Sequence, residues 1–178
     1  MQPTQKAARL ISHVSARLSM DTVIREAIES DFEQLQKLFI EENKFHSKLV
    51  PDYIQTTHDV LTIEELQTFL TNQNYQLIVC EKRHELLGAV LISLQEEREN
   101  RWKRPRTTGF IEDLIVTASA RRCGIGKQLI KAAEVWVVSH GIQTIELHVW
   151  EENTGTRQFY ESIGFLSVQR RMSLSVKG

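Results

Sequence analysis

Residues 110–150 contain the pattern that most limits the fold of this chain. Residues 110–116 are largely apolar and are typical of a strand, residues 126–140 have the spacing of a helix, and residues 144–150 alternate like a second strand. Short loops join the three segments, and Gly141 stands where a helix commonly ends. A strand, a helix and a strand joined in this way predict a right-handed crossover with the two strands parallel in one sheet.

The remaining segments extend this unit into a larger sheet. Ser30 and Thr62 each precede an acid by three residues, the pattern of a capping box at a helix start. Residues 81–85 form a polar turn that predicts an antiparallel hairpin. We expect further strands at 22–27, 75–80, 86–94 and 166–176, further helices from Ser30, Thr62 and Asn153, and irregular segments at 43–61 and 95–108. The mixture of hairpins and crossovers predicts an α/β fold with helices on both faces of a mixed sheet.

Residues 1–20 differ in composition from the rest and are predicted to be an N-terminal extension. Residues 1–19 contain no acid and are basic, which is also typical of transit peptides. A mobile extension, or a start site upstream of Met20, is the simpler interpretation. Residues 21–178 then form a single domain. The apolar residues of the extension have helical spacing and can form a short amphipathic helix: Ala7, Leu10, Ile11, Val14 and Leu18.

Composition and charge exclude several classes of protein. Among 178 residues, 22 Lys and Arg balance 23 Asp and Glu, so the net charge of −1 argues against a general coat on nucleic acid. Two cysteines, Cys80 and Cys123, are too few for a disulfide framework and favour a reducing, cytoplasmic location. The longest apolar stretch, residues 86–94, is far shorter than the ~20 residues that span a membrane.

The loop Arg121–Lys127 lies between a predicted strand and a predicted helix. Gly124 and Gly126 let the backbone approach a ligand closely, and the following helix points free N–H groups at the loop. Together with the positive charges of Arg121, Arg122 and Lys127, this arrangement suits a pyrophosphate. A tight turn with solvated arginines is the alternative, because the loop has neither the spacing of a P-loop nor three glycines of a dinucleotide fingerprint.

Two motifs in residues 110–165 resemble the GNAT superfamily of N-acetyltransferases. Arg121-x-x-Gly124-x-Gly126 matches that family's pyrophosphate motif [QR]-x-x-G-x-[GA], and Asn153 followed by Phe159-Tyr160-Glu161-x-x-Gly164-Phe165 matches its second motif. The order of elements over residues 22–176 is similar too. The resemblance implies a GNAT-like, mostly antiparallel sheet of six or seven strands. Ile111-Glu112-Asp113-Leu114 is locally similar to diamine (spermidine/spermine) acetyltransferases, without indicating the substrate.

The resemblance also implies the chemistry and the residues that carry it. The donor is acetyl-CoA, and no metal takes part. The resemblance assigns Glu112 as the base, acting through a water, and Tyr160 as the acid that protonates the leaving thiolate. Asp113 is a weaker candidate for binding the acceptor, because strict alternation places it opposite Glu112 unless a bulge intervenes. Residues expected to bind the cofactor are Leu114, Ile115, Val116, Arg121, Arg122, Cys123, Gly124, Ile125, Gly126, Lys127 and Asn153.

Three kinds of activity remain open at this point. The first is acetyl transfer to a primary amine of a small molecule or polyamine, with no nucleic-acid or membrane partner and with a homodimer left open. The second has a protein N-terminus or lysine as acceptor, and the third is a sensor that binds acyl-CoA without turnover. A nucleic-acid site on the basic residues of 98–106, around Trp102, ranks below these because acids precede and interrupt the run.

Overall fold

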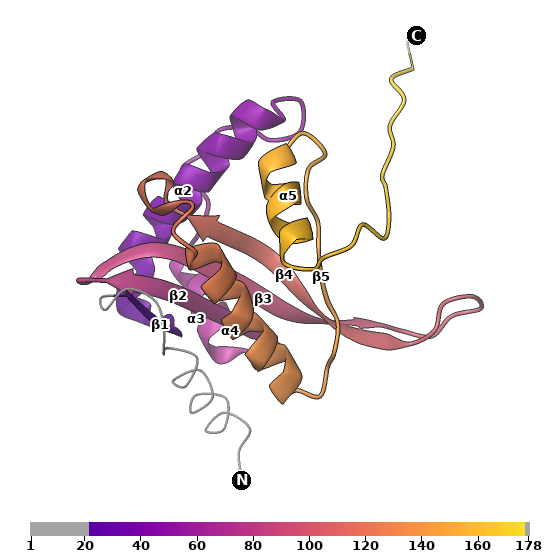
Figure 1. The fold of residues 1–178 in the computed structure, drawn as a ribbon, viewed down its shortest axis with the longest axis horizontal. Helices are drawn as coiled ribbons and strands as arrows, with labels where there is room; N and C mark the ends of the chain where they lie inside the picture. The colour runs from indigo at the N-terminus through magenta and orange to yellow at the C-terminus, as the bar shows by residue number, and fades with distance from the viewer. Residues whose placement is uncertain (1–21, 177–178) are drawn as a thin grey trace. The chain divides into compact units, whose positions relative to one another are not determined.

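The structure is a computed structural model and describes residues 22–176, so the extension predicted for residues 1–20 lies outside the described residues. In the described part, five strands form one sheet in the order β1-β2-β3-β4-β5 (Figure 1). The first four are antiparallel neighbours, and β5 is parallel to β4, as the crossover predicts. The strands are β1 Thr22–Glu26, β2 Tyr75–Lys82, β3 Glu85–Glu97, β4 Arg106–Val116 and β5 Ile145–Leu147.

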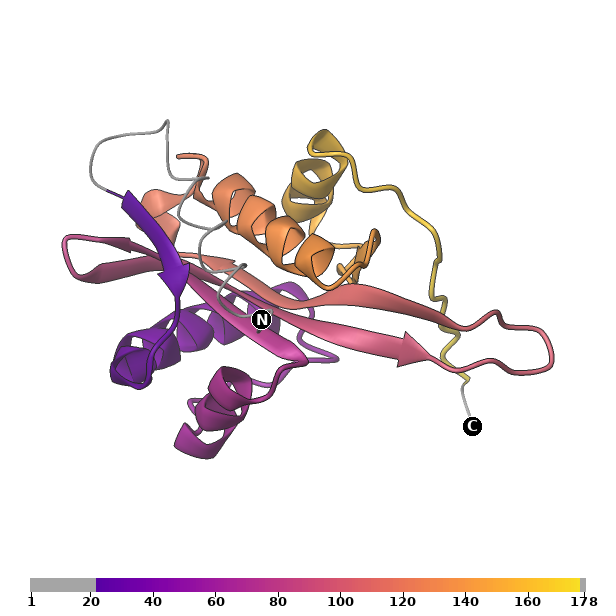
Figure 2. The same cartoon turned by 90° about the horizontal axis from the view of Figure 1, so that it is seen from below.

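Helices cover both faces of this sheet, as predicted. Figure 2 shows α2 (Phe32–Leu49) and α3 (Ile63–Thr71) on one side and α4 (Ile125–Ser139) on the other. One core cluster joins α2 and α3 to the sheet through fully buried side chains such as Leu35, Leu66 and Val79. Short 3₁₀ turns at Glu29–Asp31 and Ala118–Ala120 precede α2 and α4.

Two glycines allow close packing on the α4 side of the sheet. A Cβ at Gly109 would lie 2.5 Å from a methyl of Val137 on α4, and one at Gly88 would lie 2.6 Å from the Ile115 carbonyl oxygen. No larger residue fits at either position without displacement. The glycines therefore set how closely α4 and the neighbouring strands approach.

Residues from Val149 onward form a second compact unit. Its helix α5 (Thr154–Ser162) begins at Asn153, whose side-chain oxygen accepts a hydrogen bond of 3.3 Å from the Thr156 N–H, so the predicted cap is present. The chain turns at Gly164, which has φ 103°, beyond the helix end.

The expected six or seven strands are wrong, because residues 166–176 form no strand in the structure. The alternation of apolar and polar residues is real, but a strand also needs an edge to which it can hydrogen-bond. The structure gives this segment no such pairing within the described residues. Its apolar side chains are 84–87% exposed: Leu166, Val168, Met172, Leu174 and Val176.

Helix α2 differs from its prediction at both ends. The Ser30–Glu33 capping box does not form, because Asp31 instead binds the Arg25 guanidinium at 2.7 and 2.8 Å and the Ile28 N–H at 2.9 Å. At the other end the helix runs on to Leu49, since no Gly or Pro interrupts it before position 51. Much of the segment expected to be irregular, including His46, is therefore helical.

The capping box of α3 and the hairpin are confirmed. Thr62 and Glu65 hydrogen-bond to each other's backbone N–H at 3.2 and 2.8 Å. Strands β2 and β3 meet at a turn in which Arg83 and His84 have positive φ. The predicted loop 95–108 is shorter than expected, because β3 and β4 continue into it as a long hairpin (Figures 1 and 2).

Candidate active site

Strand β4 contains a bulge at Glu112. Ile111 pairs with Ile92 of β3 and Asp113 pairs with Leu91, so Glu112 is an additional residue without a partner in the register. A bulge of this kind breaks the alternation of side chains and directs two successive residues to one side of a sheet. The two carboxylates therefore lie on the same side of the sheet, whereas strict alternation predicts opposite sides.

Both carboxylates lie on the face of the sheet that α2 covers. Glu112 accepts a hydrogen bond of 2.6 Å from Ser93 Oγ, and Ser93 stands two residues after Leu91 of the α2-side core. Gln95 Nε2 also donates to Glu112, at 3.3 Å. Asp113 stands two residues before Ile115 of the same core and interacts electrostatically with Glu42 and His46 of α2.

The surroundings of Asp113 oppose its ionisation. Burial raises the pKa of the Asp113 carboxyl to about 7, the negative charges of Glu42 and Glu112 add to the effect, and His46 counteracts it. Among the described residues, none donates a hydrogen bond to Asp113. His46 Nε2 lies 3.7 Å from Glu42 Oε1, while its buried Nδ1 has no hydrogen-bond partner in the described structure.

The edge of β4 is open beside these carboxylates. The parallel pairing with β5 covers only Gly109–Ile111 and stops at the bulge. From Glu112 to Val116, β4 therefore has no strand partner on that side in the part of the chain that the structure describes. An extended ligand can hydrogen-bond to such an edge like an added strand. Leu114, Ile115 and Val116, predicted to bind the cofactor through their backbone, lie on this edge.

The loop after β4 leads into an uncapped helix. Gly124 is the N-cap of α4 with φ 82°, no side chain caps the first turn, and that turn contains no acid. Arg122 also has a positive φ, 65°, which helps turn successive N–H groups in one direction. A Cβ at Gly124 would meet nothing within 4 Å, so the space in front of the loop is open. Ile125, Gly126 and Lys127 form the first turn, and the arrangement fits the pyrophosphate that the motif predicts.

Arg121 holds this loop against α2 instead of projecting freely. Its Nε donates to the Val116 carbonyl at 3.1 Å, and its guanidinium lies 3.7 Å from Glu41 and over the ring of Phe45. Glu41 also accepts a hydrogen bond of 2.8 Å from the Ala118 N–H. Arg121, Arg122 and Lys127 are all exposed, and among these three Arg121 has the contacts with Val116, Glu41 and Phe45 described above.

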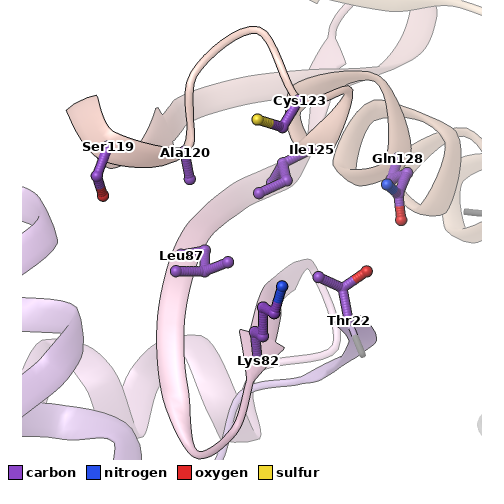
Figure 3. A pocket seen from close by; sticks show the side chains of 8 residues that line it. All are labelled: Thr22, Lys82, Leu87, Ser119, Ala120, Cys123, Ile125 and Gln128. Carbon is purple, nitrogen blue, oxygen red and sulfur yellow. The ribbon is translucent and has the colours of Figure 1, made fainter. Parts of the chain in front are cut away.

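A pocket of about 400 Å³ lies beside the same loop (Figure 3). Cys123, a free thiol, forms part of its wall. No carboxylate is among the residues of the described chain that line it, so it differs in chemistry from the bulge region. The lining residues are Thr22, Lys82, Leu87, Ser119, Ala120, Cys123, Ile125 and Gln128.

Two predicted site residues lie in the second unit. Asn153 is buried, and its side-chain oxygen accepts the hydrogen bond that caps α5. The Tyr160 ring packs against the rings of Phe159 and Phe165, each at a centroid distance of 5.3 Å. Their predicted roles toward the cofactor and the leaving thiolate stay predictions.

Three residues of the site were not predicted from the sequence: Glu42, Ser93 and Gln95. Glu42 and His46 have the i, i+4 spacing of neighbours on a helix, but the helix was expected to end before His46. Ser93 is a polar residue inside a buried strand, which is a signal that the pattern of β3 alone could have provided.

Within the described residues, no helix is long and apolar enough to cross a membrane. The same residues contain no group of three or more His, Cys, Asp or Glu side chains placed to hold a metal ion.

Comparison with known proteins agrees with this geometry. The profile of the Acetyltransferase (GNAT) family matches residues 32–165. A point mutant of the BH1408 protein from Bacillus halodurans has a similar structure, with a TM-score of 0.82 and 25% identity over 87% of this chain and 99% of its own. No curated protein matches the chain significantly.

Two more distant structures share the fold. AAC(6')-Iy, solved with a bisubstrate analogue of CoA and acetylneamine, has a TM-score of 0.65 and 19% identity over 88% of this chain and 99% of its own. The aminoglycoside 6'-N-acetyltransferase AAC(6')-IG from Acinetobacter haemolyticus has a TM-score of 0.63 and 21% identity over 86% and 97%. With its family profile, its bulged β4 and its phosphate loop, the chain belongs to the GNAT family of acetyltransferases.

Proposed function

We propose that this enzyme transfers the acetyl group of acetyl-CoA to a primary amine of a small molecule or polyamine. The observation that carries the proposal is the bulge that places Glu112 and Asp113 on one face, next to the open edge of β4. An amine with a pKa near ~10 is a cation at neutral pH, so carboxylates attract it. It must then lose a proton before its nitrogen can attack, and a carboxylate is a suitable base.

Backbone groups are the main proposed contacts to the donor. The open edge of β4 at Leu114, Ile115 and Val116 suits the extended pantetheine arm, and the uncapped first turn of α4 suits the pyrophosphate. Arg122 and Lys127 supply positive charge to the same region. Arg121, Cys123, Gly124, Ile125 and Gly126 shape the loop, and Asn153 stays a candidate contact.

The roles of the reacting groups follow from the chemistry of the transfer. One carboxylate of the bulge takes the proton of the ammonium, and the sequence favours Glu112, acting through a water. The thiolate that leaves needs a proton, for which Tyr160 is the proposed donor. The oxygen of the thioester gains negative charge, and backbone N–H groups of β4 are the proposed stabilisers.

The charge around the bulge supports a cationic small-molecule acceptor. Glu42 and Glu112 each interact electrostatically with Asp113, so an acceptor with more than one amine gains from several carboxylates. The aminoglycoside acetyltransferase among the similar structures also acts on a molecule of this kind. The proposed location is cytoplasmic, where cysteines such as Cys80 and Cys123 stay unpaired. We propose no nucleic-acid partner, and a homodimer stays a prediction.

The test is thiol release from acetyl-CoA in the presence of polyamines, aminoglycosides, amino acids and peptides, with calorimetric titration of acetyl-CoA alongside. We expect turnover with polyamines or aminoglycosides. Turnover confined to peptides would shift the acceptor to protein amines. Binding of acetyl-CoA without turnover on any amine would support the sensor, and no binding would refute the reading of the phosphate loop. Glu134→Gln, on the exposed surface of α4, is the matched control.

A further inference from the structure

We propose that Asp113 accepts the proton of the acceptor ammonium, and that Glu42 and His46 of α2 are positioning residues that control the protonation of Asp113. The inference rests on the proposed function and deepens it, because it separates the roles of two adjacent carboxylates. It also moves the role of base from Glu112 to its neighbour.

The Glu112 side chain is held by two hydrogen bonds. One of its oxygens, Oε1, accepts hydrogen bonds from Ser93 Oγ at 2.6 Å and Gln95 Nε2 at 3.3 Å. Ser93 is only 3% exposed, so its hydroxyl is fixed toward Glu112. These two donors fix the position of the Glu112 carboxylate, which is therefore placed to attract the ammonium of the acceptor.

The surroundings of Asp113 differ from those of Glu112. No described residue donates a hydrogen bond to Asp113, and it is half-buried on the face of the sheet that α2 covers. The titratable groups that face it are Glu42 and His46 from α2 and Glu112 from β4. Burial and the two negative charges raise the pKa of Asp113 to about 7, which suits a base that must both take and return a proton at neutral pH.

Helix α2 supplies two groups, one helical turn apart, that have opposite effects on the protonation of Asp113. Glu42 favours the protonated form of Asp113, and His46 favours the ionised form. His46 Nε2 lies 3.7 Å from Glu42, and its Nδ1 is buried without a partner among the described residues. The pair is therefore placed to tune Asp113 without itself being required to react.

The proton balance of the transfer is complete with these groups. The acceptor R–NH₃⁺ gives one proton to the Asp113 carboxylate, and the freed nitrogen lone pair forms the N–C bond to the thioester carbonyl carbon. The C–S bond breaks with its electron pair on sulfur. Tyr160 gives its proton to the sulfur, which leaves as CoA thiol, and the second proton lost by the former ammonium as the amide forms replaces the proton of Tyr160. Asp113 returns its proton to solvent.

The test compares the pH dependence of kcat/KM for the acceptor in the wild type, Asp113→Asn, Glu112→Gln, Glu42→Gln and His46→Gln. We expect activity in the wild type to rise through a pKa near 7. Asp113→Asn should lose this rise and about 10²–10⁴-fold in kcat. Glu112→Gln should keep a rise, shifted to lower pH because its charge also raises the pKa of Asp113, and should increase KM. Glu42→Gln should shift the rise to lower pH, and His46→Gln to higher pH.

A second readout does not depend on turnover. Calorimetry of spermidine binding at pH 7 in two buffers of different ionisation enthalpy counts the protons released. The wild type should release a fraction of a proton as the cation ionises Asp113, Glu112→Gln should release less because its Asp113 is more ionised beforehand, and Asp113→Asn should release none. Equal release by Asp113→Asn, or unchanged kcat in that variant, overturns the inference alone. No thiol release by the wild type on any amine overturns the proposed function and this inference together.

Discussion

Asp113 couples the stability of the fold to pH, independently of any catalytic role. Its pKa is raised from 3.8 in the unfolded chain to about 7 in the folded one, so the folded state holds the proton more tightly. The stability from this group is complete below pH 4 and is lost as pH rises through about 7. Stability is lost because ionisation of Asp113 forces a negative charge into this site.

We therefore expect Asp113→Asn to gain stability relative to the wild type as pH increases. The two proteins should differ little near pH 4. The difference in free energy of unfolding should grow up to about pH 7, at about 1.4 kcal/mol for each unit of pKa shift. Urea unfolding across this range measures it, with Glu134→Gln as the control. Parallel curves for the wild type and Asp113→Asn would contradict the burial of an unsatisfied carboxyl.

The residues of the site show what spacing reveals and what it leaves out. Gly124 and Gly126 pointed to an anion site, and the positive φ of Gly124 and the uncapped helix agree with that interpretation. The spacing of residues in a motif does not show in which direction a side chain points. Arg121 matches the pyrophosphate motif, yet its side chain hydrogen-bonds to the Val116 carbonyl and lies 3.7 Å from Glu41.

Among the elements, α4 owes its position to two glycines of the sheet. At Gly109 an added methyl would meet a methyl of the buried Val137 side chain, whereas at Gly88 it would meet a backbone oxygen, which cannot move without its strand. The same substitution should therefore have a different effect at each site. The packing of α4 in turn places the loop that begins at the end of β4.

We expect Gly88→Ala to destabilise the fold by about 1–3 kcal/mol through overpacking, and Gly109→Ala by less. Adding Val137→Ala to Gly109→Ala should recover part of the loss, because it removes the methyl that collides. Thermal and urea unfolding of the single and double variants measure this. If Gly88→Ala is as stable as the wild type, the close approach of β3 and β4 at this position is wrong; if the double variant shows no recovery, the close approach of α4 and β4 is wrong.

Elements built on local signals were predictable from the sequence, and elements that depend on partners were not. The crossover from β4 through α4 to β5 and the capping box of α3 follow from periodicity and capping residues. The bulge at Glu112 was one of two alternatives, because alternation alone cannot show where a register shifts. Residues 166–176 have the pattern of a strand but find no edge in this structure.

At the scale of the whole molecule, the first unit combines two surfaces that acetyl transfer requires. One is an open strand edge that leads to an uncapped helix, and the other is a pair of carboxylates under α2. Both originate in β4, because the bulge that turns the carboxylates also marks where pairing with β5 stops. The central claim is that this single irregularity serves the donor and the acceptor together.

Mass spectrometry of an amine incubated with acetyl-CoA tests that claim most directly. We expect one acetyl group to be added to a polyamine or aminoglycoside by the wild type, and none above background by the double variant Glu112→Gln, Asp113→Asn. Calorimetry should show that the double variant still binds acetyl-CoA, since its loop and helix are unchanged. Equal acetylation by the wild type and the double variant would contradict the account, because the bulge would then have no part in the reaction.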